Sequence, residues 1–107
     1  MNEEKRKRLE EKGFRVGTVA EFLELSPEEE SIIETRLALS RAVKKRRLAM
    51  NLTQEAAAKR LHSSQSRIAK MEAGDKTVSL DLMVRNLFGL GVKAEELPDV
   101  LAEALEG

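Results

Sequence analysis

A short polar segment near the middle of the chain carries side chains that can hydrogen-bond to the edges of DNA bases. It consists of Ser64, Gln65, Ser66 and Lys70. Glutamine can form two hydrogen bonds with adenine, lysine can reach the acceptors of guanine, and serine can donate or accept. These four residues within seven positions predict a surface that reads bases in double-stranded DNA.

Residues around this segment have the chemistry for the DNA backbone instead. Gln54 stands at the expected start of a helix, where its side chain and the free backbone amides can bind a phosphate. Basic side chains add phosphate contacts that position a protein without specifying sequence. The basic residues expected to do so are Lys59, Arg60 and Arg67.

Two short helices must hold these side chains in place. The pattern predicts helices over 54–61 and 65–73, joined by a tight turn at 62–64. Helices so closely connected need small side chains where their backbones approach, and Ala57 and Ala58 supply them. Apolar residues then fill the wedge between the helices: Leu61, Ile68 and Met71. The polar segment is thereby left on the outer face of the second helix.

The remaining pattern is also helical, and it predicts an all-α chain. Ser26-Pro27 followed by three glutamates begins a long helix that runs to about Met50, with a possible break near Ser40. Ser79 caps a further helix from Leu80 to Leu90. After an interruption at Leu97-Pro98-Asp99, a last helical segment reaches about Leu105. The total is a bundle of about five helices.

The net charge of zero conceals a strongly basic centre. Residues 31–76 carry 11 basic and 4 acidic side chains, whereas the segments on both sides are acidic. This is the charge pattern of a polyanion-binding surface. A run of basic residues on the long helix can either neutralise phosphates or form a solvated face. The run consists of Arg41, Lys44, Lys45, Arg46 and Arg47.

Several function classes are excluded by composition. The chain has no Cys, Trp or Tyr and one His, so thiolate or multi-histidine metal sites, cysteine nucleophiles and aromatic platforms for single-stranded bases are not expected. No catalytic constellation is visible, and we expect no enzyme, no cofactor, no metal and no ligand pocket. Because no apolar run is long enough for a bilayer and no signal-peptide pattern is present, we expect no membrane partner and a cytoplasmic location.

The segment from Leu39 to Leu90 resembles the lambda-repressor-like helix-turn-helix family, also called the Cro/repressor or Xre family. The resemblance rests on Leu52-Thr53-Gln54-Glu55, on the run SSQSRIAKMEAG and on the helix that follows. It implies that Gln54, Ser64, Gln65, Ser66 and Lys70 contact DNA, in the cytosol or at the nucleoid of a bacterium or phage-infected cell. It also implies a buried, structural ion pair between Arg47 and Glu72.

One position departs from the family pattern. Many members have glycine where this chain has His62, because the turn requires a positive φ. We interpret His62 as a turn residue under strain, and not as a metal ligand.

The N-terminal part carries a weaker resemblance. Residues 16–23, Val-Gly-Thr-Val-Ala-Glu-Phe-Leu, are similar to an extension found in HigA-type antitoxins. We expect residues 1–26 to form an arm with a short helix, and residues 27–107 to form the helix-turn-helix domain with a C-terminal helical tail. The resemblance suggests an autoregulatory or toxin–antitoxin context.

Three functions are compatible with the pattern. The first is a transcriptional repressor that acts as a homodimer on an inverted repeat, the second an antitoxin that neutralises a partner toxin and autoregulates its operon, and the third a dimer scaffold without DNA binding. The polar face opposes the scaffold, because a scaffold would place apolar residues there. The dimer contact is expected either at the C-terminal helices or at the N-terminal arm. The candidate residues are Leu97, Val100, Leu101 and Leu105, or Phe14, Phe22 and Leu23.

Overall fold

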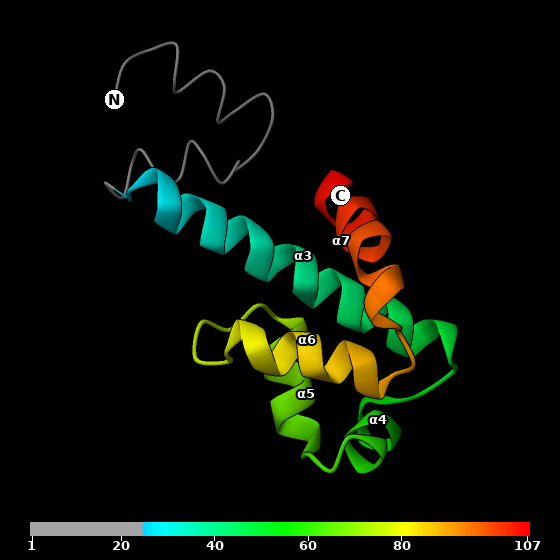
Figure 1. The fold of residues 1–107 in the computed structure, drawn as a ribbon. Helices are drawn as coiled ribbons and strands as arrows, with labels where there is room; N and C mark the ends of the chain where they lie inside the picture. The colour runs from blue at the N-terminus through cyan, green and yellow to red at the C-terminus, as the bar shows by residue number, and fades with distance from the viewer. Residues whose placement is uncertain (1–24) are drawn as a thin grey trace. The chain divides into compact units, whose positions relative to one another are not determined.

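The computed structural model describes residues 25–107, and within them the chain is helical throughout (Figure 1). It contains five α-helices and one 3-10 helix, with no strand in this part of the chain. The elements are α3 (Pro27–Ala49), α4 (Gln54–Arg60), α5 (Gln65–Glu72), α6 (Leu80–Gly89), η1 (Ala94–Glu96) and α7 (Leu97–Glu106). The predicted all-α bundle of about five helices is confirmed.

The chain divides into two compact units, Met1–Thr35 and Arg36–Gly107, so α3 contributes to both. The side chains of α3 become fully buried only from Ala38 onward, which places its packing role in the second unit. Ile32, assigned to the apolar stripe from sequence, is 48% exposed. The predicted boundary between residues 26 and 27 stays a prediction, and the predicted arm and short helix lie outside the described residues.

The start of α3 follows the predicted capping chemistry. The Ser26 hydroxyl accepts a hydrogen bond from the Glu29 amide at 3.2 Å, and Glu29 accepts one from the Ser26 amide at 3.4 Å. The helix then continues through Ser40 without a break. The Ser40 hydroxyl donates to the Arg36 carbonyl at 2.9 Å, so this buried polar group has a partner inside the helix.

The core of the second unit lies between α3, α5 and α6. Its fully buried members with the largest side chains are Leu39, Val43, Ile68, Met71, Met83, Leu87 and Leu90. The end of α6 also approaches α4 closely. A Cβ at Gly89 would lie 2.4 Å from Cδ2 of Leu61, so only glycine fits without a shift of that side chain.

The tail differs from its predicted course. Pro98 does not interrupt a helix but stands in the first turn of α7, where its missing N–H has no helical partner to lose. Four side chains of α7 pack against the core: Leu97, Val100, Leu101 and Ala104. Figure 1 shows α7 beside the second half of α3, apart from α4 and α5. No helix in residues 25–107 is both long and apolar enough to span a bilayer.

Candidate nucleic-acid interface

Helices α4 and α5 form a pair with a tight connection, as the sequence predicts. Thr53 caps α4 by accepting from the Ala56 amide at 3.0 Å, and Ser64 caps α5 by accepting from the Arg67 amide at 3.2 Å. Ala57 is 0% exposed at the helix crossing. The small side chains and the two caps together fix the direction of α5.

The turn between the helices contains the predicted strained residue. His62 has a φ of 53°, in the left-handed region that favours glycine. This conformation lets the Ser63 amide donate to the Ala58 carbonyl at 2.8 Å, which closes the end of α4. Asn51 makes the equivalent turn after α3, with a φ of 58°. Asparagine tolerates this region better than most residues do.

The reading face, defined as Ser64, Gln65, Ser66 and Lys70, is exposed along its whole length. Its members lie on the side of α5 opposite the buried Ile68 and Met71. The Ser64 hydroxyl already serves as the helix cap and lies 3.5 Å from that of Ser66. Ser64 therefore has a structural role that does not depend on DNA, whereas Gln65, Ser66 and Lys70 are exposed and cap no helix.

A chain of hydrogen bonds connects the reading face to the interior. The Gln65 amide donates to Oε1 of Gln54 at 2.7 Å, and the Gln54 amide donates to Oε1 of Glu72 at 3.3 Å. Glu72 in turn accepts two bonds from Arg47, at 2.6 and 2.9 Å. The side chain of Gln65 is thus bound to Gln54, which is connected in turn to Glu72 of α5 and Arg47 of α3.

The Arg47–Glu72 pair at the base of this network is buried. The two side chains are 9% and 5% exposed, and the third guanidinium nitrogen donates to the Leu52 carbonyl at 2.8 Å. The hydrogen bonds to Glu72 raise the pKa of Arg47, against the opposing effect of burial. A pair with two parallel hydrogen bonds, whose remaining donor also has a partner, can be buried without leaving an unpaired charge. The Arg47–Glu72 pair can therefore connect α3 to α5 inside the domain.

The residues expected at phosphates have different surroundings. The side chains of Lys59, Arg67 and Lys70 make no hydrogen bond with any described residue and extend from α4 and α5. Arg60 instead donates to the Gly89 carbonyl at 3.1 Å, toward the end of α6. Gln54 keeps one amide hydrogen beyond the one given to Glu72.

The basic run on α3 is mostly engaged inside the chain. Arg41 donates to the Ala104 carbonyl, Arg46 donates to the Leu90 carbonyl, and Lys45 pairs with Glu103. With Arg47 bound to Glu72, four of its five members have intramolecular partners. These contacts give the run a structural explanation, which the sequence alone left open.

One polar contact near α5 was missed by the sequence reasoning. Arg36 donates to the carbonyls of Asp75 and Val78 and so fixes the loop that follows α5. The carboxylate of Asp75 accepts from the hydroxyl and the amide of Thr77, which lowers the pKa of Asp75. The signal was the position of Arg36 on the same helical stripe as Leu39, where a charged residue implies a specific partner.

The comparisons with known proteins agree with this geometry. The model of the family described as Helix-turn-helix matches residues 43–97, just over half of the 107 residues. The match contains α4, the turn, α5 and α6, together with the whole reading face. It excludes residues 16–23, so the resemblance to HigA-type antitoxins stays a prediction. Neither the curated proteins nor the solved structures searched include a match to this chain.

Proposed function

This chain belongs to the lambda-repressor-like helix-turn-helix family of DNA-binding regulators, and on that premise we propose that it is a repressor that binds an inverted repeat as a homodimer. The base-reading residues in this proposal are Gln65, Ser66 and Lys70, with Ser64 at the start of the recognition helix. The phosphate contacts are Gln54, Lys59, Arg60 and Arg67.

The observation that carries the proposal is the support of Gln65. A free glutamine on a helix surface samples several rotamers and loses that freedom when it binds a base. The 2.7 Å bond to Gln54 restricts this motion before DNA arrives, and Gln65 is still exposed. A preorganised amide at the start of α5 is suited to two hydrogen bonds with adenine in the major groove.

The positions of the basic residues support the same surface. Lys59 and Arg67 come from the two helices of the pair, on either side of the turn, and both are exposed. Side chains in such positions can reach the phosphates that border a groove, while the N-terminal amides of α4 can donate hydrogen bonds to one phosphate. This arrangement gives affinity through the phosphates and specificity through α5.

A single recognition helix of eight residues offers few base contacts. The specificity that one such helix supplies is small against the number of competing sites in a genome. A two-fold dimer doubles the contacts and places two α5 helices in successive major grooves, about 34 Å apart. An inverted repeat in the operator is therefore part of the proposal.

The test is binding of the full chain to the DNA upstream of its own gene and to random duplex of equal length, over a series of salt concentrations. The proposal predicts that preference for the upstream DNA persists as salt rises, while binding to random duplex disappears. Equal binding to both duplexes, lost together as salt increases, would contradict base reading.

The alternative function is neutralisation of a toxin. Its sequence basis lies in residues 16–23, outside the described residues, and no described contact favours it over repression. A gene for a small toxin beside this one, and a stable complex of the two products, would turn the proposal toward an antitoxin that autoregulates its operon.

A further inference from the structure

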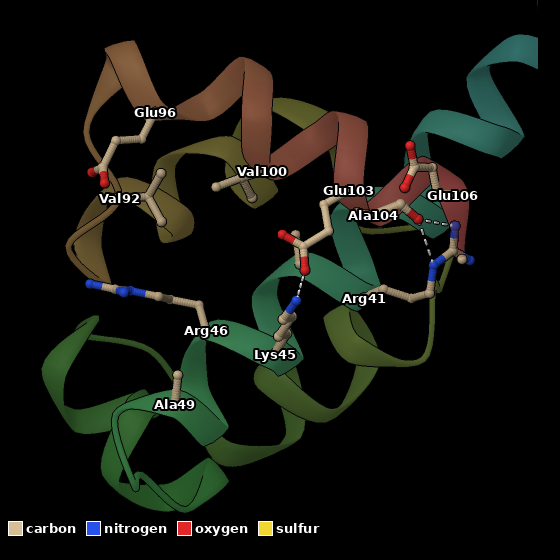
Figure 2. Close-up of a pocket in the computed structure, with 12 residues that line it drawn as sticks. Arg41, Lys45, Arg46, Ala49, Val92, Glu96, Val100, Glu103, Ala104 and Glu106 are labelled. Atoms are coloured by element: carbon tan, nitrogen blue, oxygen red, sulfur yellow. Dashed lines mark hydrogen bonds and ion pairs between the residues drawn. The ribbon is translucent and has the colours of Figure 1, made fainter.

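A groove of about 580 Å³ lies between the second half of α3 and α7, although no pocket was expected from the sequence (Figure 2). Its apolar lining comes from small side chains: Ala42, Ala49, Val92, Val100 and Ala104. No residue of α4 or α5 lines this groove. It is therefore a surface separate from the reading face.

The two walls of the groove carry opposite charges. The basic wall consists of Arg41, Lys45 and Arg46 on α3, and the acidic wall consists of Glu96, Glu103 and Glu106 on η1 and α7. The segregation extends beyond the groove, because residues 36–49 include six basic and no acidic residues, and residues 94–107 include five acidic and no basic ones. In Figure 2 the basic side chains come from α3 and the acidic ones from η1 and α7, and Lys45 meets Glu103 between them.

One ion pair crosses the groove between its two walls. Lys45 and Glu103 form an ion pair across it, and their side chains are 69% and 64% exposed. An exposed pair of this kind contributes little to folding and stays available to further charges. Lys45 and Glu103 must therefore stand opposite each other at the same distance along the groove.

This pattern restricts what can cover the groove. DNA would be repelled by the acidic wall, and an anion or cation that suits one wall is repelled by the other. The occupant needs an apolar strip with an acidic row on one side and a basic row on the other. A second copy of the chain has such a surface, because rotation by 180° about the groove axis brings each basic wall to face the partner's acidic wall.

We propose that this face, the α3–α7 groove with its two charged walls, is the interface between two copies of the chain. The proposal rests on the proposed function insofar as that function requires a dimer, and it adds where the dimer contact lies. In this arrangement Lys45 of one copy faces Glu103 of the other, so the two intramolecular pairs join into a cluster of four alternating charges. The charged walls make the contacts, and the apolar lining of both copies is removed from bulk solvent between them.

The apolar stripe of α7 provides a second, independent support. Its members recur at helical spacing, and the inner ones pack against the chain's own core. Leu105 continues the stripe but is 54% exposed. A stripe that extends past the core it covers has apolar surface left for a partner. Leu105 does not itself line the groove, but it lies on the same helix as Val100 and Ala104, which do.

The decisive test separates contacts between chains from contacts within one chain. Lys45→Glu and Glu103→Lys each place like charges opposite each other in both halves of the interface. We expect each variant alone to raise the Kd of the dimer about tenfold or more, measured by sedimentation equilibrium of the full chain. An equimolar mixture should return to within about threefold of the wild-type Kd, because every facing pair in the mixed dimer is again opposite in charge.

The mixture is informative because the intramolecular pair remains broken in both of its components. Recovery on mixing can therefore come only from contact between chains. A mixture no tighter than the single variants would overturn the proposal. So would a wild-type chain that sediments at the 12.0 kDa of one copy at every concentration tested.

A second measurement uses two leucines with the same exposure. Leu105→Glu should produce a monomer that still melts cooperatively, because this side chain is exposed before assembly. Leu48→Glu, equally 54% exposed but on α3 and not on the apolar stripe of α7, should remain a dimer. If only Leu48→Glu dissociated, the interface would lie elsewhere on the chain.

Failure of this interface and failure of the proposed function give different results. An incorrect interface leaves sequence-specific DNA binding by the wild type intact, with Lys45→Glu dimerising as the wild type does. An incorrect function leaves the wild type without preference for any duplex, whatever its state of association.

Discussion

The reading face and the α3–α7 groove both present polar side chains to solvent, but they differ in the sign of their charge and in the burial of the ion pair beside them. Lys70 gives the reading face a positive charge, and the only carboxylate of α5, Glu72, is occupied by Arg47. The groove combines three basic and three acidic side chains. One surface thus suits a polyanion, and the other suits a surface of mixed charge.

The ion pairs beside the two surfaces also differ, in how far they are exposed to solvent. The Arg47–Glu72 pair behind the reading face is 9% and 5% exposed, whereas the Lys45–Glu103 pair at the groove is 69% and 64% exposed. Two ion pairs in one small domain therefore have different roles. The buried pair fixes a helix and a glutamine in position, and the exposed pair leaves its charges accessible to a partner.

The largest effect is expected when the buried pair is broken. Glu72→Ala should lower the free energy of unfolding by about 3–5 kcal/mol, because it leaves the charge of Arg47 buried without a partner. Lys45→Ala, at the exposed pair, should change it by less than about 1 kcal/mol. Urea unfolding of both variants at the same low protein concentration measures the difference.

A double variant checks the physical reason. With Arg47→Met and Glu72→Met together no unpaired charge remains, so the double variant should be more stable than Glu72→Ala. If the double variant were equally unstable, lost packing and not the uncompensated charge would explain the result. Equal effects at the buried and exposed pairs would remove the contrast between the two regions.

The next effect concerns base reading. Gln65→Ala should weaken operator binding by about 1–3 kcal/mol and relax the preference at one base position. Gln54→Ala should reduce the preference at the same base position by less, since it removes the support of Gln65 but not its amide. It should also weaken binding to every duplex, because Gln54 is a proposed phosphate contact. Fluorescence anisotropy with operators altered at single positions measures both changes.

The effect of Gln65→Ala on operator and on random duplex distinguishes base recognition from sequence-independent binding. If Gln65→Ala weakened operator and random duplex equally, the assignment of Gln65 to base reading would be wrong. Lys93→Ala, which removes an exposed charge beyond α6, is the matched control and should leave the preference unchanged.

A smaller effect is expected at the phosphates. Arg67→Ala should weaken binding to all duplexes alike and reduce the slope of log K against log salt by about one. The groove variant Glu103→Lys should show the opposite pattern. It should raise the Kd of the dimer and leave the slope of log K against log salt unchanged for each bound subunit. A loss of sequence preference in Arg67→Ala would move this residue from the phosphates to the bases.

The smallest effect is expected in the turn that orients the reading face. His62→Gly should raise the free energy of unfolding by up to about 1 kcal/mol, because glycine adopts a positive φ without the Cβ penalty. Asn51→Gly should change it less, since asparagine tolerates this region. Thermal melts compare the two; a destabilised His62→Gly would mean that the imidazole makes a contact that outweighs the strain.

Local pattern was sufficient for much of this molecule. The caps at Ser26, Thr53, Ser64 and Ser79 set the starts of four helices, because each hydroxyl satisfies amides only a few residues away. Ala57 and Ile68 could be assigned to the helix crossing from helical spacing alone. The course of the tail was predicted wrongly at Pro98, since proline stops a helix in its interior but is compatible with its first turn.

The network behind Gln65 could not be derived in the same way. Gln54 and Gln65 are separated by a turn, and Arg47 reaches Glu72 from another helix, so their contacts depend on how three helices pack. The pairing of Arg47 with Glu72 came from the family resemblance and not from spacing. Likewise, the loop anchored by Arg36 joins residues about 40 positions apart, for which sequence spacing carries no information.

By itself, the sequence determined the helices, the turns and the residues of the reading face, because these follow from periodicity, capping and side-chain chemistry within a few positions of the chain. Tertiary structure alone decided that a buried ion pair supports Gln65 and that α7 lies beside α3 to form a groove with opposed charged walls. The physical reason is that packing and electrostatic contacts depend on distance in space, and hydrogen bonds between distant segments exist only after the core has brought their helices together.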